Sequence, residues 1–558
     1  MSEPQQTTWK SASLAVLLLT ILSVLVIAPL GVLVGGAIPD SSSEVDALRA
    51  FVLDTPLLQS MLRTLTVALL ACGLASAIAI PAAVVAVRCR GPVRIMIQFL
   101  ALLPLTMPPF LGAAMLRQFS AAFNQTEYAR TLGEIHVEGN DLALILVFAL
   151  HFMPLILFSL MAGLARINRG YAESAHTLGG NGLLVWRRIT LPLATPAYAA
   201  GASLMLLKIF EDLGTPLMLG IDGMLGPQLL LRLGSAGLSD PALGVSALLL
   251  FGASLVVVTL AWSALLPPLG PAIPDHRHHP ARWRGGPVSS FTAAVLTIVL
   301  GTLALAPHLW LFLTSLGSSW SGRLLPDAYG LAHYQQLSID TLPNLGGTLA
   351  YAAGAGVFAL LLGSAFGTLT TQQGTLARIM RFAATALFAV PGVVLALGYL
   401  KARHLIDPGL AGWPAWGWLA LLLVVGFKQL PFSQRLMALS LRRLGKGELE
   451  SARNLGSTEF SAHLRITLPA LTGALGAVFL LGFLAAIVEL SAVLLLLQEP
   501  QAPFAHRLFQ TLQTPAMAGL GAAQGMLLAG LVGSGLLVAL ILLRQRRALT
   551  SEYPAAHR

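Results

Sequence analysis

Apolar stretches long enough to cross a lipid bilayer recur along the whole chain, and this feature restricts the possible folds most strongly. About 20 apolar residues in helical form span the hydrocarbon core of a membrane. The chain is 56% hydrophobic and only 10% charged, whereas a soluble domain carries about 25% charged residues. We therefore predict an all-α polytopic membrane protein with about twelve transmembrane helices in two parallel repeats of six. The expected helices fall at roughly 12–34, 61–87, 95–116, 141–163, 193–213, 242–266, 290–314, 344–370, 379–400, 416–439, 471–493 and 519–543.

The net charge of +10 does not indicate a nucleic-acid partner, because the Lys and Arg residues stand singly between apolar stretches. Loops that hold most of these residues alternate with loops that hold few. By the positive-inside rule, the richer set faces the cytoplasm. This set includes both termini and the loops at 164–192 and 440–470. The apolar run at 11–34 exceeds the 7–15 residues of a signal-peptide core, so we expect an uncleaved first helix.

A polar stretch of twenty residues occurs twice between these apolar runs. Residues 173–192 read ESAHTLGGNGLLVWRRITLP, and residues 450–469 read ESARNLGSTEFSAHLRITLP. The two copies align without a gap at an offset of 277, with ten of twenty positions identical. An internal duplication with matched polar loops favours a transporter over a membrane enzyme with a single active site.

The duplication divides the chain into two halves joined by a connector rich in Pro, His and Arg. Since each half holds an even number of expected helices, both insert the same way up, and a pathway is expected at their interface near the midplane. His276, His278 and His279 of the connector are possible metal ligands, but a solvated basic connector is the favoured interpretation. Cys72 and Cys89 make neither a disulfide framework nor a metal spacing. The expected divisions are 1–266 (transmembrane domain at about 60–266), the cytoplasmic linker 267–289, and 290–558 (transmembrane domain at about 344–543).

The repeated stretch has the composition of a short helix, a glycine turn and a return into the membrane. Glu173 to Thr177 favours a helix, Gly179 interrupts it, and Pro192 suits the first turn of the next helix. Such a helix docks in a groove of a partner or lies on lipid headgroups. Because the spacing is kept in both copies, we favour docking.

This spacing resembles the EAA loop of bacterial ABC-importer permeases of the type I class, and the resemblance covers nearly the whole chain. Ser174 and Ser451 stand where the family usually has Ala, which is a small-for-small change. In that family the loop is a coupling helix that inserts into a cytoplasmic ATP-binding subunit. The matching residues are Glu173, Ser174, Ala175, Gly179, Ile189, Leu191 and Pro192, then Glu450, Ser451, Ala452, Gly456, Ile466, Leu468 and Pro469.

The resemblance implies two copies of an ATP-binding subunit, a periplasmic substrate-binding protein, and a location in the bacterial inner membrane. The chain has no run of the form G-x-x-x-x-G-K-[ST], which is the phosphate-binding loop of ATPases. We therefore expect no enzymatic activity and no cofactor in this chain, with ATP and Mg²⁺ bound by the partner subunits.

Ionisable residues within membrane helices are candidates for a substrate pathway. Lys208, Glu211 and Asp212 stand together, and Asp212 matches Glu489 in the second half. These acids are expected near the outer ends of their helices, which Gly214-Thr215-Pro216 and Gln498-Glu499-Pro500 are expected to end. Two interpretations stay open. The acids form a ring on a cation path, or Lys208 neutralises Asp212 at i,i+4 or Glu211 at i,i+3.

His151 and Lys428 are two further candidates, since they occupy equivalent positions in the helices that precede the two loops. They are expected at the interface between the halves, where they either contact substrate or serve structure alone.

The substrate is the least determined part of the prediction. The stretches EDLGTPLMLG and ELSAVLLL look most like fused permeases for ferric iron, and related permeases carry thiamine, phosphonates such as 2-aminoethylphosphonate, or polyamines. An ion-coupled secondary transporter is the alternative of a different class. A polytopic membrane enzyme would need a cluster of His, Asp or Cys at one membrane face, and none is visible apart from the connector histidines.

Overall fold

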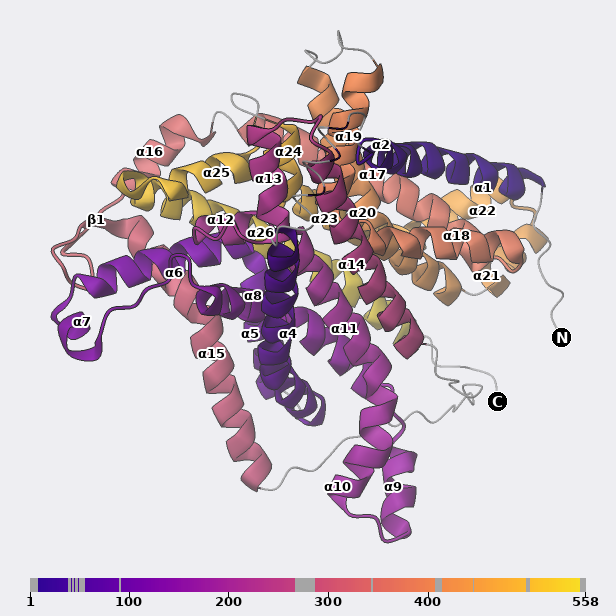
Figure 1. Ribbon diagram of the computed structural model, residues 1–558. Helices are drawn as coiled ribbons and strands as arrows, with labels where there is room; N and C mark the ends of the chain where they lie inside the picture. Colours follow the sequence, from indigo (N-terminus) through magenta and orange to yellow (C-terminus); the bar gives the residue numbers. More distant parts are fainter. Residues whose placement is uncertain are drawn as a thin grey trace.

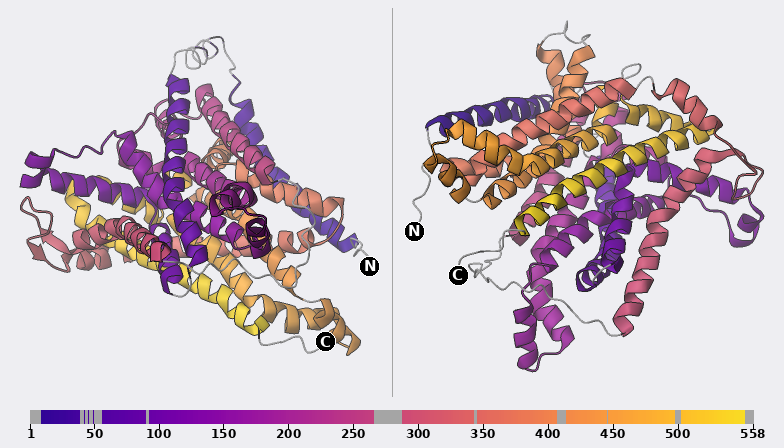
Figure 2. Two further views of the ribbon diagram at one scale, coloured as in Figure 1. Left: turned by 90° about the horizontal axis from the view of Figure 1, so that it is seen from below. Right: turned by 180° about the vertical axis from the view of Figure 1, so that it is seen from behind.

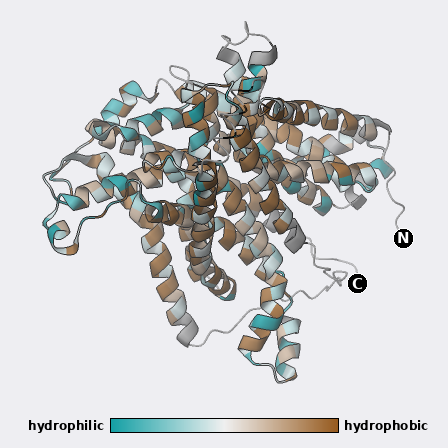
Figure 3. Cartoon of the chain, viewed as in Figure 1, coloured by the Kyte–Doolittle hydropathy of each residue, from teal (hydrophilic) through white to brown (hydrophobic). Residues whose placement is uncertain are grey.

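The computed structural model describes residues 9–38, 42, 45, 49, 56–89, 92–265, 287–342, 345–406, 414–444, 446–497 and 502–551. This part of the chain is helical apart from loops and one short antiparallel pair, β1 (Gly317–Ser319) with β2 (Ala328–Tyr329). Within these described residues, ten helices are long and apolar enough to cross a membrane, or up to twelve if each of two bent pairs counts as one span. The predicted all-α polytopic class is thus confirmed, and apolar residues cover the long helices (Figure 3).

The elements of the first half follow the expected stretches closely. They are α1 (Trp9–Leu22), the π-helical turn η1 (Ser23–Ile27), α2 (Ala28–Gly35), α4 (Pro56–Arg88), α5 (Pro92–Leu102), the 3₁₀ turn η2 (Leu103–Thr106), α6 (Pro109–Asn124), α7 (Glu127–Leu132), α8 (Asp141–Leu164), α9 (Arg169–Thr177), α10 (Gly182–Val185), the π-helical turn η3 (Trp186–Thr190), α11 (Leu191–Glu211), α12 (Gly214–Met218), α13 (Leu225–Ser235) and α14 (Pro241–Leu265).

The second half repeats this order from residue 345 onward, except that no described element corresponds to α7 and a 3₁₀ turn precedes the last helix. Its elements are α15 (Pro287–Leu316), α16 (Ala332–Asp340), α17 (Leu345–Thr371), α18 (Thr375–Ala386), the 3₁₀ turn η5 (Leu387–Ala389), α19 (Gly392–Ile406), α20 (Pro414–Arg443), α21 (Lys446–Asn454), α22 (Glu459–Ala462), the π-helical turn η7 (His463–Thr467), α23 (Leu468–Val488), α24 (Ser491–Leu496), α25 (Phe504–Gln513), the 3₁₀ turn η8 (Pro515–Met517) and α26 (Ala518–Ser551). The connector histidines lie outside the described residues.

Two of the expected helices, 95–116 and 379–400, are each broken by a sharp bend. The first breaks between Thr106 and Pro109 with an angle of 87°, and the second between Ala389 and Gly392 with an angle of 92°. Met107 and Val390, which each precede a proline, are extended, because the proline ring disfavours the helical conformation of the residue before it. Residues at the first bend line the cavity described below, and the N–H of Gly392 at the second bend reaches the carboxylate of Glu211.

The helices that carry the acids also end earlier than expected. α11 ends at Glu211 and α23 ends at Val488, so Asp212 and Glu489 are the C-caps. The expected stop at residues 214–216 instead forms α12, and the expected stop at 498–500 lies outside the described residues. The prediction that these stretches end the two helices is therefore wrong.

The first helix of each half packs against the other half. α2 contacts α19 and α1 contacts α18, whereas α15 contacts α5 and α6 as well as α26. Figure 1 and Figure 2 show α1 and α2 (indigo) beside the orange helices, and α15 beside α4 and α5. The halves are thereby interleaved.

Small residues let helices approach closely within each half. A Cβ added to Gly363 of α17 would lie 2.4 Å from the Cβ of Ser433 in α20. A Cβ added to Gly201 of α11 would lie 2.7 Å from the carbonyl oxygen of Leu155 in α8. Glycine at such contacts is typical of helix packing in membranes, where van der Waals contact supplies much of the attraction.

Candidate functional site

The first copy of the repeated stretch projects from the body of the molecule as α9 and α10 (Figure 1). Asn168 caps α9, since its side chain accepts a hydrogen bond from the backbone N–H of Gly170 at 2.9 Å. Gly179 then adopts φ +83°, and the N–H of Gly180 donates to the carbonyl of Ala175 at 2.8 Å. This is the hydrogen-bond pattern with which a helix commonly ends on a left-handed glycine.

The second copy has the same backbone geometry. Gly456 adopts φ +85°, and the N–H of Ser457 donates to the carbonyl of Ala452 at 3.0 Å. In both copies a short helix and a π-helical turn follow, and Pro192 or Pro469 is the second residue of the long helix α11 or α23. The shared sequence therefore produces a shared shape.

Both loops present polar and apolar side chains to their surroundings. Glu173, Ser174, Glu450 and Ser451 are exposed, and Ala175 and Ala452 are half-buried. The leucines just before the turns are among the most exposed apolar side chains in the described chain, with Leu178 at 88% and Leu455 at 87%. Each loop thus presents an exposed apolar side chain together with an exposed carboxylate.

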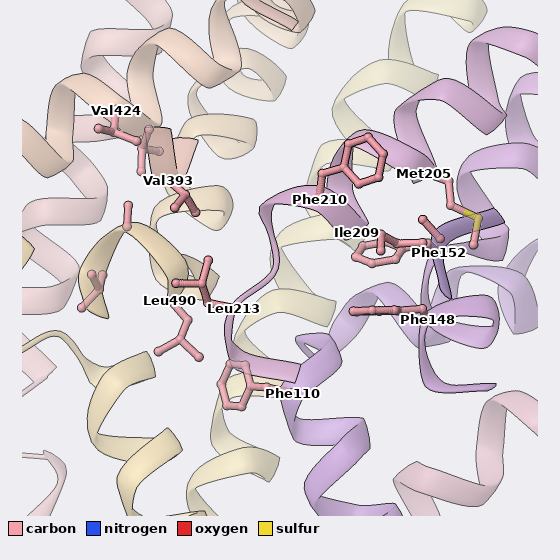
Figure 4. Close-up of a cluster of buried hydrophobic side chains, with 14 of the residues drawn as sticks. Phe110, Phe148, Phe152, Met205, Ile209, Phe210, Leu213, Val393, Val424 and Leu490 are labelled. Carbon is pink, nitrogen blue, oxygen red and sulfur yellow. The ribbon is translucent and has the colours of Figure 1, made fainter. Parts of the chain in front are cut away.

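The six candidate pathway residues line one cavity of about 250 Å³ between the halves. Its walls come from the bend before α6, from α8 and α20, and from the broken ends of α11 and α23. Figure 4 shows Leu213 and Leu490 beside each other in this region, with Phe110 next to them. The candidates gathered here are His151, Lys208, Glu211, Asp212, Lys428 and Glu489.

Lys428 joins acids from both halves. Its Nζ lies 3.0 Å from Oε2 of Glu211 and 3.0 Å from Oε2 of Glu489. Lys208 lies 3.5 Å from the same oxygen of Glu211, so of the two pairings that the sequence left open, the structure has the one at i,i+3. The N–H of Gly392 also donates to Oε1 of Glu211 at 3.3 Å.

Asp212 and Glu489 have equivalent roles in the backbone. Asp212 accepts hydrogen bonds from the N–H and the hydroxyl of Thr215 at 2.8 and 2.9 Å. Glu489 accepts one from the N–H of Ala492 at 3.1 Å. Each carboxylate thus caps the short helix that follows the break, which explains why both halves keep an acid at this position.

His151 takes the place in the first half that Lys428 takes in the second. Its ring lies edge-on to Phe152, with centroids 4.7 Å apart. Since Lys428 is charged and ion-paired while His151 packs on an aromatic ring, the cavity is chemically asymmetric. Among the described residues, no group of three or more His, Cys, Asp or Glu side chains is arranged to hold a metal ion.

Several cavity residues were not among the sequence candidates. The hydroxyl of Ser491 accepts a hydrogen bond from the N–H of Leu213 at 3.1 Å, which joins the two broken segments. Pro108 and Pro109 also line the cavity. The likeness of the stretch around these prolines to that around Pro391 was a usable signal, because a proline inside an apolar run marks a break.

Comparison with known proteins finds a transport family and several permeases that this chain resembles. Residues 75–269 match the family described as the binding-protein-dependent transport system inner membrane component. The chain is 23% identical over 417 residues to a ferric transport system permease protein, FbpB 1, of Haemophilus influenzae, covering 71% of this chain and 63% of the relative.

Two shorter similarities reach permeases named for other solutes. The molybdenum transport system permease ModB of Mycobacterium tuberculosis is 29% identical over 187 residues, covering 32% of this chain and 69% of the relative. The 2-aminoethylphosphonate transport system permease PhnU of Salmonella typhimurium is 38% identical over 73 residues, covering 13% of this chain and 26% of the relative. These similarities support an inner-membrane permease of an ABC importer, and among the relatives named here the ferric transport permease shares the longest stretch with this chain.

Proposed function

We propose that this chain forms the membrane pathway of an ATP-driven importer, in which each half supplies one coupling loop. A periplasmic binding protein delivers a small solute, and two copies of a cytoplasmic ATP-binding subunit bind ATP and Mg²⁺ and engage the loops. Both termini lie in the cytoplasm in this proposal. The exposed tips at Leu178 and Leu455, and the identical turns at Gly179 and Gly456, support two equivalent docking sites.

The observation that carries the proposal is the direct helical link between each loop and the cavity. α11 begins directly after the first loop and ends at Glu211, and α23 begins after the second loop and ends one residue before Glu489. A helix of about 21 residues is about 30 Å long and transmits displacement of one end to the other. When the two loops approach each other, the far ends of these helices therefore move as well. They carry Glu211 and Glu489, which Lys428 links across the interface between the halves.

In this mechanism the cavity alternates between the two sides of the membrane. When the ATP-binding subunits close, both loops approach each other and the interface opens outward, so that the binding protein releases its solute into the cavity. ATP hydrolysis separates the loops and opens the interface inward. The ion pairs from Lys428 to Glu211 and Glu489 hold the cavity closed between these states.

Ferric iron is the first candidate solute. The similarity to ferric transport permeases extends over 71% of this chain, and three carboxylates face the cavity against two ammonium groups. Carboxylate oxygens suit a hard cation. Thiamine, 2-aminoethylphosphonate and polyamines remain alternatives for the same machinery, and an ion-coupled secondary transporter is the alternative of another class.

Copurification tests the docking assignment. The tagged chain is expressed with its ATP-binding subunit, and the two are expected to copurify as a stable complex. Gly179→Asp with Gly456→Asp should abolish the complex, because it places a carboxylate on the exposed turn of each loop and adds strain to a left-handed backbone. Gly182→Glu is the matched control, since the second copy carries Glu459 at the equivalent position. Equal retention of the partner by the double variant and by the control would contradict the assignment.

A further inference from the structure

A group of arginines in the second half is not used by the transport mechanism. Arg378 and Arg381 of α18 and Arg435 and Arg442 of α20 all line one cavity of about 520 Å³. A neighbouring cavity of about 580 Å³ is lined by Arg378, Arg381 and Arg442 together with Gln372 and Gln373. α18 and α20 pack against each other, so the four guanidinium groups converge from two helices on one hollow.

Among the described residues, no acid shares the two cavities with these positive charges. Arg381 donates to the carbonyl of Thr370 at 2.7 Å, and Arg378 donates to the hydroxyl of Thr375 at 3.2 Å. Both acceptors are uncharged, and since a guanidinium has five N–H donors, most of the donors on these side chains remain available to a ligand.

Two features preorganise the hollow for an anion. The guanidinium carbon of Arg435 lies 5.4 Å from the centroid of the Phe388 ring, a cation–π contact that restricts the side chain. α18 begins beside the hollow at Thr375, and no side chain caps its N-terminal N–H groups. The partial positive charge of a helix N-terminus favours anions.

The fold itself does not require these arginines. At the offset of 277, Arg435 matches Phe158 and Arg442 matches Ala165. The shared run Arg-Ile-Met, at 94–96 and 378–380, places Ile97 opposite Arg381. The first half therefore builds the same helices with apolar residues at three of the four positions.

Membrane orientation alone does not explain the convergence either. The positive-inside rule concerns Lys and Arg in loops and near helix ends. Arg435 instead lies seven residues before Arg442 within α20, about 10 Å deeper along the helix. Phe382 and Leu439, exposed at 68% and 56%, line the same hollow, so apolar and basic groups stand side by side there.

We propose that Arg378, Arg381, Arg435 and Arg442 form a binding site for a phosphate-type oxyanion at the end of α20 that leads into the second coupling loop. Guanidinium groups bind phosphate through paired, charge-assisted hydrogen bonds, and basic pockets between membrane helices bind anionic headgroups. The ligand is an anionic phospholipid headgroup or a free oxyanion such as phosphate. An occupant of this site stabilises the α18–α20 pair beside α21.

The test measures binding of both possible ligands, a lipid headgroup and a free oxyanion, to the purified full chain. In one arm, native mass spectrometry records retention of phosphatidylglycerol against phosphatidylcholine. In the other, equilibrium dialysis records binding of radiolabelled inorganic phosphate. We expect at least one anionic probe to bind, and to bind about thirtyfold more weakly to a variant that lacks two arginines, since each contributes about 1 kcal/mol near an anionic surface. Retention of the lipid identifies a headgroup site, and binding of phosphate identifies a site for free oxyanions.

Two double variants are compared, so that the test does not depend on the folding of a single variant. Arg378→Gln with Arg442→Gln changes exposed side chains, and Arg381→Gln with Arg435→Gln changes the other two. Arg94→Gln is the control and should leave binding unchanged. Arg94 is equivalent to Arg378, and this is the one of the four equivalent positions at which the first half also has Arg. The proposal is overturned if neither probe binds the native chain, or if both folded double variants bind as tightly as the control.

Discussion

Replacement of Lys428 by Met tests the ionic contact that joins the two halves. The side chains of Lys428, Glu211 and Glu489 are only 10%, 14% and 12% exposed. Removing one partner of a buried ion pair costs about 3–5 kcal/mol, because a charge is left without compensation. In Lys428→Met, Glu489 loses its only ion pair among the described residues, whereas Glu211 keeps Lys208 at 3.5 Å. We expect a destabilisation near the lower end of that range.

The assay is thermal unfolding of the purified chain, monitored by intrinsic fluorescence. Two further variants serve as comparisons. Lys208→Met should lower the midpoint much less, because Lys208 is 35% exposed and makes one longer contact. Combining Lys428→Met with Glu489→Gln should recover much of the loss, since the uncompensated carboxylate becomes neutral. Equal midpoints for native protein and Lys428→Met, or equal losses for Lys428→Met and Lys208→Met, would refute the reasoning.

The remaining predictions concern the coupling loops. Gly179→Ala with Gly456→Ala should cost about 1–2 kcal/mol per turn, from backbone strain alone, because no atom lies within 4 Å of either added Cβ. Partner ATPase activity stimulated by the loaded binding protein should fall, while Gly182→Ala should leave it unchanged; a normal rate in the double variant would argue against a role for the turns. Glu173→Lys or Glu450→Lys should reduce the same stimulated activity without reducing the amount of protein in the membrane. Native solute uptake in both charge variants would contradict the assignment of these glutamates.

The helical class followed from the sequence because apolarity over about 20 residues is a local property. The bends at Met107 and Val390 did not follow from it, since a hydropathy pattern records how apolar a stretch is and not its direction. The prolines at 108, 109 and 391 were nevertheless visible. The early end of α23 at Val488 had no such signal, because Glu489 stands within an otherwise apolar run.

The candidate site was partly accessible from the sequence. Because ionisable residues are rare in membrane helices, the sequence alone indicated the six residues that line the central cavity. The pairing of Lys428 with Glu211 joins residues of different halves, and no local spacing predicts a contact of that kind. The backbone donor at Gly392 and the hydroxyl acceptor of Ser491 are likewise products of the tertiary fold.

Solute uptake by reconstituted vesicles tests the central claim, that ATP hydrolysis in partner subunits drives transport through this chain, most directly. The chain, its ATP-binding partner and the loaded binding protein are reconstituted in proteoliposomes, and accumulation of ⁵⁵Fe is followed with ATP and Mg²⁺ on the side of the coupling loops. The account predicts uptake that requires ATP and is lost in Gly179→Asp with Gly456→Asp. Uptake driven by a proton or sodium gradient without ATP would contradict it.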